Sequence, residues 1–316
     1  MPPSPARAET SQTADTVLIA SPESFSRYAN STAYGSSAQN PGYHSGVISL
    51  AVEQFLVVTR RLEKEGVTLY RLTDNEDFGA RQTVFPGERF STHRNDNGTS
   101  TLVIYPLAAP YEAATNFVDA ALETFKRHRY QVDRTFDLSY YESEGRALEG
   151  SGSIVFDRAR QVAFCALSPN TDKAIADEFC ETMGYRSVYF QARDKFDTLV
   201  RHTADMMSVG EKFAVVCAES IRDSRIRETV LEEIRLLGKE VIEISLEQML
   251  NACGAIIQLR SADGRKLIIL SKRAHEHFTE DQLMALRRSG KLVVVESIAI
   301  EEISGSGIGG LMAEVF

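Results

Sequence analysis

The ten residues Leu148-Glu149-Gly150-Ser151-Gly152-Ser153-Ile154-Val155-Phe156-Asp157 combine a carboxylate, a glycine-rich turn and an apolar strand. Glycine adopts positive φ angles and allows close backbone approach at little cost, so this composition predicts a tight turn. The turn would hold Glu149 at the mouth of the strand. Most glutamates beside glycines are ordinary loop residues. Whether Glu149 is one of these or a functional residue depends on the pattern in the rest of the chain.

Similar units recur along the sequence. Each consists of a β-hairpin, an amphipathic helix and one further strand, as the hydrophobic periodicity indicates. The predicted hairpins pair residues 89–93 with 101–106, 152–156 with 161–167, 206–209 with 213–217, and 255–259 with 266–270. The helices are predicted over residues 45–64, 112–128, 171–183, 222–237 and 280–289. The strands that follow these helices are predicted over residues 67–72, from 130–133 onward, and over 187–190, 240–244 and 292–295.

The first helix has no hairpin before it, and one unpaired strand remains at each end of the chain. These two strands are residues 16–20 and 311–315. Pairing them would supply the missing hairpin and close a ring of five units, an arrangement that limits exposed sheet edges. We therefore predict an α/β fold, a five-bladed β/α propeller with pseudo-fivefold ββαβ repeats. A doubly wound α/β sheet is the alternative, but hairpins followed by crossover helices fit it less well.

Composition narrows the class of ligand. The chain has 316 residues, of which 43% are hydrophobic and 25% charged, with a net charge of −9. The excess of acidic residues argues against nucleic-acid binding, because a protein that binds nucleic acid needs a basic surface. The same negative charge favours small cationic or zwitterionic ligands.

The ends and the cysteines point to an intracellular protein. We expect an N-terminal tail over residues 1–12 and a single domain over 13–316, with neither a secretory signal nor a transmembrane segment. The four cysteines are scattered without a CxxC pair, so neither a metal site nor a disulfide framework is indicated. We expect a cytoplasmic or mitochondrial protein without cofactor.

In a closed ring, the turns that enter each first hairpin strand converge on the axis. The residues at these turns are Gln82 or Thr83, Glu149, His202, Gly254-Ala255 and Gly309-Gly310. Glu149 and His202 are thus predicted to share a central pocket. A carboxylate that orients an imidazole can support proton transfer, or the pair can simply rigidify the hub.

Several segments resemble the arginine deiminase-related amidinotransferase family, and within it the citrulline-utilisation hydrolases. These segments are residues 11–18, Val84-Phe85-Pro86, Phe90-Ser91-Thr92-His93, 148–153, 209–217, 239–245 and 312–316. The resemblance runs in order along nearly the whole chain from Ser11 and implies the five-bladed propeller, or pentein fold, independently of the repeats. It also implies a chemistry in which a cysteine thiolate attacks a guanidino or ureido carbon. Histidine would act as acid and base, and carboxylates would bind the planar nitrogens.

By this resemblance Glu149 matches the family's glutamate and His202 its catalytic histidine. The nucleophilic cysteine is expected shortly before the closing Ala-Glu motif, where this chain has Gly310. Glycine has no side chain, so covalent catalysis at that position is impossible.

Three further pocket positions also depart from the family pattern. Gln82 stands where an aspartate is expected, and Ala204 and Ala255 stand where asparagines are expected. Gln82 removes a charge that would hold a guanidinium. Changes at separate blades indicate a loss of function across the pocket, rather than one isolated substitution.

Three functions remain open. The first is a catalytically inactive protein kept as a structural or accessory subunit, with protein partners or as a homo-oligomer. The second is a hydrolase of citrulline, arginine or a related compound, for which Cys253 would be a displaced nucleophile; a buried thiol is the simpler interpretation of Cys253. The third is a non-catalytic sensor in which Glu149 and His202 still bind a small cationic metabolite.

Overall fold

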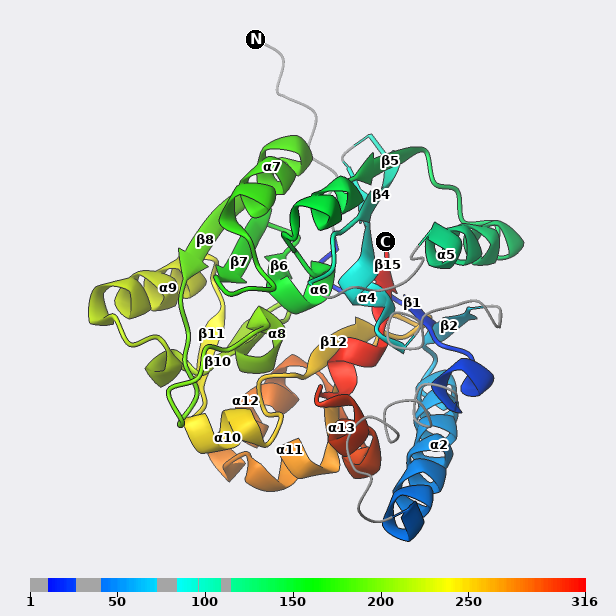
Figure 1. Cartoon of the computed structure of the whole chain (residues 1–316). Helices are drawn as coiled ribbons and strands as arrows, with labels where there is room; N and C mark the ends of the chain where they lie inside the picture. The colour runs from blue at the N-terminus through cyan, green and yellow to red at the C-terminus, as the bar shows by residue number, and fades with distance from the viewer. Residues whose placement is uncertain (1–10, 27–40, 73–83, 96, 109–114) are drawn as a thin grey trace.

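A computed structural model of the chain describes residues 11–26, 41–72, 84–95, 97–108 and 115–316. The strands in these residues form five three-stranded sheets. The sheets lie around a common centre, with long helices outside them and short helical turns inside (Figure 1). The predicted five-bladed β/α propeller is thereby confirmed.

Every sheet has the same internal topology. Its middle strand pairs antiparallel with one neighbour and parallel with the other. Four sheets are built from consecutive strands, namely β3 (Phe90–Arg94), β4 (Ser100–Ile104) and β5 (Arg134–Asp137); β6 (Ile154–Asp157), β7 (Val162–Ala166) and β8 (Arg186–Phe190); β9 (Met207–Val209), β10 (Phe213–Val216) and β11 (Glu240–Glu243); and β12 (Ile257–Arg260), β13 (Lys266–Ser271) and β14 (Lys291–Val295). In each of them the antiparallel pair is a hairpin, as the repeat predicts.

The fifth sheet joins the two ends of the chain. In it β1 (Thr16–Ile19) lies between β15 (Ala313–Val315) and β2 (Thr68–Arg71). Thr16 pairs antiparallel with Val315 and parallel with Thr68. The two unpaired strands thus supply the missing hairpin, and the ring closes as predicted.

The long helices run on the outside, each before the third strand of its sheet (Figure 1). They are α2 (Pro41–Lys64), α5 (Thr115–Arg127), α7 (Lys173–Met183), α9 (Ser224–Leu236) and α12 (Glu280–Ser289). Asp172 and Asp223 begin α7 and α9 by accepting bonds from backbone N–H groups of the first turn. No helix among the described residues combines the length and the hydropathy needed to cross a bilayer.

Short helical turns enter the first strand of a sheet at the centre of the ring. They are α4 (Pro86–Arg89), α6 (Gly150–Ser153), α8 (Thr203–Met206) and the 3-10 turn η3 (Ile308–Leu311). The predicted glycine-rich turn is therefore a single turn of helix. Gly150 has φ +35°, and a Cβ atom there would lie 2.2 Å from the carbonyl oxygen of Gly87, so only glycine fits at this position.

The remaining elements connect the units. They are η1 (Ser139–Glu144), η2 (Ala218–Ser220), α10 (Leu246–Leu250), α11 (Lys272–His277) and α13 (Ile298–Ser304). Three predicted features fall partly outside the described residues: positions 1–10 of the N-terminal tail, positions 112–114 of the second helix, and Asp96 in the connection between the strands predicted over 89–93 and 101–106.

One predicted strand starts four residues too early, whereas the other predicted strands begin within two residues of their expected positions. The strand expected to begin at Tyr130 begins at Arg134. The Tyr130 hydroxyl donates to the carbonyl oxygen of Phe316 (2.7 Å), and the Asp133 carboxylate accepts the N–H of Ser100 (2.8 Å). The backbone N–H of Asp133 also donates to the carbonyl oxygen of Ser100 (3.0 Å), and parallel pairing starts with Arg134 opposite Thr101.

Polar contacts tie neighbouring sheets together near the axis. Lys239 and Asp157, both almost fully buried, form an ion pair of 3.0 Å between the sheets of β11 and β6. The Thr203 hydroxyl donates to the carbonyl oxygen of Ser153 (2.6 Å) and accepts the N–H of Ala166 (2.8 Å). These bonds set α8 against α6, and so fix the position of the residues that precede each turn.

Candidate functional site

Glu149 lies directly before α6 and is buried. Its backbone N–H donates to the hydroxyl of Ser153 (2.9 Å), which in turn donates to the carbonyl oxygen of Asn170 (2.5 Å). The glycine-rich stretch therefore holds the Glu149 backbone from both sides. The side chain has little freedom to leave the hub.

The structure brings Glu149 and His202 together. The carboxylate oxygen Oε2 of Glu149 lies 2.5 Å from Nε2 of His202, although the two residues belong to different sheets. Gly152 leaves room for the imidazole, because a Cβ atom at that position would lie 3.0 Å from its Cδ2 atom. The pair predicted from the turn positions therefore meets at the centre of the ring.

The surroundings of the pair favour its charged form. Asn170 Nδ2 donates to Glu149 Oε2 (2.8 Å), and the N–H of Ala108 donates to Oε1 (3.0 Å). Burial acts to raise the pKa of Glu149, but the hydrogen bond from His202 and these donors outweigh it and lower that pKa.

Three carboxylates act on His202. Burial disfavours the imidazolium, but the hydrogen bond to Glu149 and the nearby Glu88 and Asp205 carboxylates raise the pKa of His202 to about 9. The hub therefore holds an imidazolium–carboxylate pair at neutral pH.

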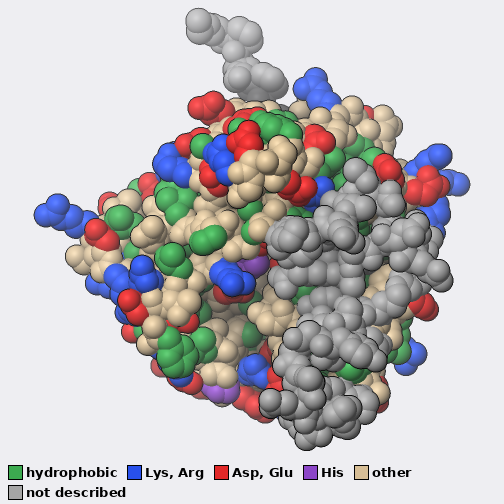
Figure 2. All heavy atoms as spheres, in the orientation of Figure 1, with side chains coloured by type: hydrophobic (Ala, Val, Ile, Leu, Met, Phe, Trp, Pro, Cys, Tyr) green, Lys and Arg blue, Asp and Glu red, His purple; other side chains and the backbone are tan. Residues whose placement is uncertain are grey.

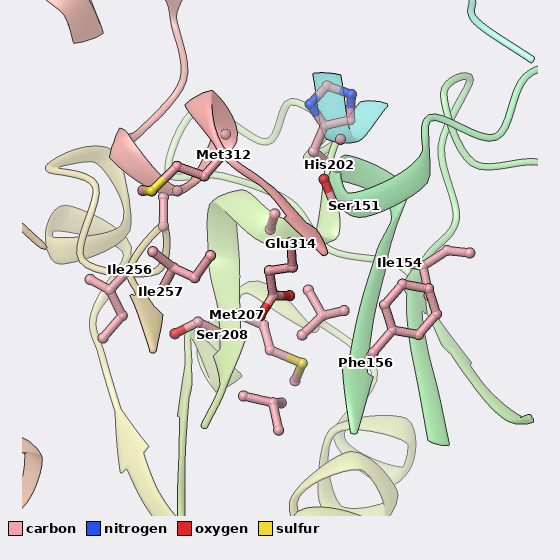
Figure 3. Close-up of a pocket in the computed structure, with 18 of the residues that line it drawn as sticks. Ser151, Ile154, Phe156, His202, Met207, Ser208, Ile256, Ile257, Met312 and Glu314 are labelled. Atoms are coloured by element: carbon pink, nitrogen blue, oxygen red, sulfur yellow. The ribbon is translucent and has the colours of Figure 1, made fainter. Parts of the chain in front are cut away.

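A cavity of about 130 Å³ lies beside His202 on the ring axis. The face in Figure 2 is hollowed near its centre, where a histidine side chain is visible. Figure 3 shows His202 and Ser151 at one end of the cavity and apolar side chains along it. The hub positions Ala204, Ala255, Gly309 and Gly310 line it, together with Glu88, Asp205 and Ser306.

Gly310, the position expected to carry the nucleophile, lies in η3 and faces this cavity. A Cβ atom there would lie 2.6 Å from the Ser306 hydroxyl oxygen and 3.4 Å from a ring carbon of Phe85. The Ser306 side chain thus occupies space into which a side chain at position 310 would extend. Of the other altered positions, Ala204 and Ala255 line the same cavity, and Gln82 lies outside the described residues.

No cysteine of the chain lines the cavity. All four cysteines are buried. The thiol of Cys253 donates to the carbonyl oxygen of Ala274 (3.4 Å), and burial raises the pKa of Cys253 to about 12. Burial likewise raises the pKa of Cys165, Cys180 and Cys217. These thiols are kept protonated and out of reach of a ligand at the hub.

The described residues contain no cluster of three or more His, Cys, Asp or Glu side chains placed to hold a metal ion. The polar groups at the hub are instead arranged for hydrogen bonding and charge pairing. An arrangement of three carboxylates around one imidazolium can attract a cation, and it can fix the imidazolium in place.

Four residues of this site were not predicted from the sequence. Glu88 stands two residues after the Val84-Phe85-Pro86 segment, and Asp205 stands three residues after His202, so both adjoin positions already singled out. Counting every residue of each hub turn, instead of one, would have found them. Asn170 and Ser306 carry no such signal, because each reaches the hub from a loop outside the turns.

Comparison with known proteins places the chain in a family. The family model described as eukaryotic N,N-dimethylarginine dimethylhydrolase matches residues 22–316. No curated protein sequence matches the chain with significance.

Solved structures with the same fold include enzymes of cyanobacteria. The substrate-bound N-terminal domain of ArgZ, an arginine dihydrolase of the cyanobacterial ornithine–ammonia cycle, has a TM-score of 0.66 and 12% identity over 95% of this chain and 97% of that domain. The chain spans only 39% of the longer ArgZ chain.

Unliganded AgrE has a TM-score of 0.68 and 14% identity, and the match covers 95% of this chain and 39% of the AgrE chain. SxtG, an amidinotransferase of Microseira wollei, has a TM-score of 0.64 and 13% identity, and the match covers 99% of this chain and 98% of the SxtG chain. At these identities the structures confirm the fold. Because the family model covers nearly the whole chain, the protein belongs to the eukaryotic N,N-dimethylarginine dimethylhydrolase family, within the arginine deiminase- and amidinotransferase-related pentein superfamily.

Proposed function

We propose that this protein is a catalytically inactive member of its family, kept as a structural or accessory subunit of a larger assembly. The observation that carries the proposal is Gly310, which faces the hub cavity where the resemblance expects a nucleophilic cysteine. Loss of a nucleophile removes most of an enzyme's rate, because the remaining groups only bind and orient the substrate.

The other thiols support the same proposal. A displaced nucleophile would have to reach the cavity as a thiolate. Cys253, the candidate for that role, is fully buried and held protonated by its surroundings. The hydrolase alternative therefore lacks a residue to start the reaction.

The Glu149–His202 pair is compatible with this role. An imidazolium can donate a proton, but without a nucleophile at position 310 it has no reaction to serve. The Glu149–His202 contact instead acts as a buried ion pair that joins two sheets at the hub. A protein that keeps the propeller fold but lacks catalytic activity functions through its surface. We infer an intracellular subunit that binds other proteins or copies of itself.

The carboxylates around His202 favour a second candidate function, a non-catalytic sensor of a small cationic metabolite. Glu88 and Asp205 line the cavity, and the net charge of −9 adds a favourable field for cations. Arginine, the compound named for the dihydrolase ArgZ, is the first ligand to test.

A thiol placed at position 310 should become reactive. We expect the double variant Gly310→Cys/Ser306→Ala to be alkylated by chloroacetamidine at position 310, because Ser306→Ala removes the oxygen that a Cβ atom would meet. The wild-type protein should carry no adduct under native conditions. Mass spectrometry of the intact and digested protein measures both.

A control variant distinguishes a thiol inside a ligand-binding pocket from a thiol that is merely exposed on the surface. Ala262 is exposed in the turn between β12 and β13 and does not line the hub cavity, so Ala262→Cys should react alike with chloroacetamidine and with neutral chloroacetamide. The thiol at position 310 should prefer the amidinium reagent. An adduct on Cys253 in the wild-type protein, or turnover of arginine or citrulline, would contradict the proposed inactivity.

The pKa of His202 should fall when Glu149 loses its charge. In the Glu149→Gln variant burial still disfavours the imidazolium, while its main partner is neutral. Histidine NMR resonances followed against pH should show a pKa near 9 in the wild type and a lower one in the variant. Glu144→Gln, at an exposed carboxylate, should leave the titration unchanged.

The same pair makes stability depend on pH. The folded-state pKa of His202 lies above its ordinary value of 6.5, so the stabilisation is complete below pH 6.5 and is lost as pH rises through about 9. The wild type should lose more stability than Glu149→Gln between pH 6.5 and 9 in urea unfolding. Equal losses in both proteins would show that the pair is not charged.

The native protein should be found in an assembly. We expect size-exclusion chromatography of gently extracted protein, followed by cross-linking and mass spectrometry, to place it in a complex larger than one chain. A protein that elutes as a lone monomer at native concentration would count against the accessory role.

Arginine should bind at the hub if the protein is a sensor. Calorimetry would then show saturable binding that Glu88→Gln weakens about ten-fold or more, since hydrogen bonds to charged groups are among the stronger ones. Glu144→Gln is the matched control and should leave the affinity unchanged. A flat titration with the wild type excludes arginine as the ligand.

A further inference from the structure

A second hollow, which we call the outer groove, adjoins the hub cavity. It has a volume of about 400 Å³ and shares Asp205, Ala255 and Ser306 with that cavity. The loop between β8 and α8 forms one part of its lining, and residues of α10, α11 and α13 form much of the rest. The groove is therefore built from the outer loops of several sheets, next to the mouth of the hub.

The loop between β8 and α8 is a short hairpin held by its own hydrogen bonds. The N–H of Asp194 donates to the carbonyl oxygen of Thr198 (2.9 Å). The Asp194 carboxylate accepts the N–H groups of Phe196 and Thr198, both at 2.8 Å. Residues 198–201, on the returning side of the hairpin, all line the groove. The hairpin therefore gives the groove a wall of fixed shape.

Two exposed apolar side chains flank the outer end of the groove. Phe196 stands at the tip of the hairpin and is 73% exposed. Nζ of Lys195 lies 5.3 Å from the centre of the Phe196 ring and 2.7 Å from the carboxylate of Glu247 in α10. Leu250, three positions farther along α10, lines the groove and is also exposed. Figure 1 shows the same approach of this loop to α10.

Arg201, at the base of the hairpin, carries the unpaired charge of the groove. Its side chain is exposed and makes no hydrogen bond or ion pair with the residues that the structure describes. The other charged side chains of the lining are engaged: Asp194 in the hairpin turn, Asp205 beside the hub imidazolium, and Arg273 with Glu301 (3.5 Å). A ligand in the groove is therefore best complemented by one carboxylate at Arg201.

The spacing of these groups sets the size of the ligand. Arg201 stands five positions after Phe196, so their Cα atoms lie at most about 18 Å apart. An extended chain covers such a span with about five residues. A molecule that contacts both side chains therefore has the length of a peptide segment.

The residue types also fit a protein interface. Aromatic and arginine side chains contribute most of the binding energy in many protein complexes. The net charge of −9 repels a strongly acidic partner, so a single carboxylate suits this surface better than a run of them.

We propose that the outer groove docks an extended segment of a partner protein, in which one acidic residue stands about four positions from a bulky apolar residue. The apolar side chain packs against Phe196 and Leu250, and the acidic side chain pairs with Arg201. The backbone of the segment lies along residues 198–201. This inference rests on the accessory function proposed above, and it names the chemistry of the partner.

Four acetylated peptide amides test the proposal. The reference peptide has the sequence Phe-Thr-Thr-Thr-Glu, and the others replace its Glu by Gln, its Glu by Lys or its Phe by Ala. With methyl-labelled full-length protein, we expect the reference peptide to give saturable NMR shifts at Met249 and Leu250. Each replacement should weaken binding about ten-fold or more, because it removes one of the two anchoring contacts.

Two substitutions at exposed positions assign the anchors. Arg201→Glu should weaken binding of the reference peptide about ten-fold or more, and it should bind the lysine peptide more tightly than the reference peptide. Phe196→Ala should weaken the reference peptide to a similar extent and leave the alanine peptide unchanged. Arg134→Glu and Leu236→Ala are matched controls, exposed and outside the groove, and should leave every affinity unchanged.

The native assembly separates this inference from the accessory function. If the double variant Phe196→Ala/Arg201→Glu leaves the larger complex, as we expect, while the two control variants stay in it, the groove is the docking site. If the double variant stays in the complex and the reference peptide does not bind, the docking site is wrong and the accessory function stands. A lone wild-type monomer contradicts the accessory function, and with it the partner segment.

Other outcomes overturn the proposal directly. Equal affinity of the wild type for the Glu and Gln peptides rules out pairing with Arg201. Tighter binding of the lysine peptide by the wild type would place the ligand at the carboxylates of the hub instead. Self-association of the purified chain that Phe196→Ala abolishes would make a second copy the occupant of the groove.

Discussion

Antiparallel pairing of β1 with β15 is the contact on which the remaining geometry depends. It joins the two ends of the chain into one sheet, and it carries η3 and Gly310 to the centre of the ring. Thr92 of the next sheet secures the closure, since its hydroxyl donates to the carbonyl oxygen of Glu314 (3.2 Å) and accepts the N–H of Phe316 (3.0 Å). A shift by one residue would turn every side chain of β15 to the other face, so the register also fixes which of them enters the cavity.

The ion pair at the hub is held in place by its own burial. Removing either Glu149 or His202 would leave a buried charge without its partner, which costs far more than removing both. The pair can therefore persist after a nucleophile is lost, and its presence does not by itself indicate catalysis. Gly310, Ala204 and Ala255, which have no side chain or a small one, line the cavity beside the pair.

Most of the fold was predictable because each unit repeats the same local pattern. The periodicity of α12 and the hairpin of β12 and β13 follow from neighbouring residues alone. The start of β5 was not predictable, because Tyr130 and Asp133 bond to residues distant in sequence, and the local pattern does not show where strand pairing begins. In the site, Glu149 and His202 could be found from their turns, whereas the parts played by Asn170, Ser306 and Glu314 could not.

The sequence by itself determined the five repeated units, the glycine-rich turn that holds Glu149, and the absence of a side chain at position 310. These features depend on short-range sterics and on residue identity, which need no knowledge of the ring. Only the tertiary structure decided that three carboxylates surround His202, that Cys253 is buried away from the hub, and that Glu314 lines the hub cavity. Those relations arise between residues of different sheets, and they exist only once strand pairing has closed the ring.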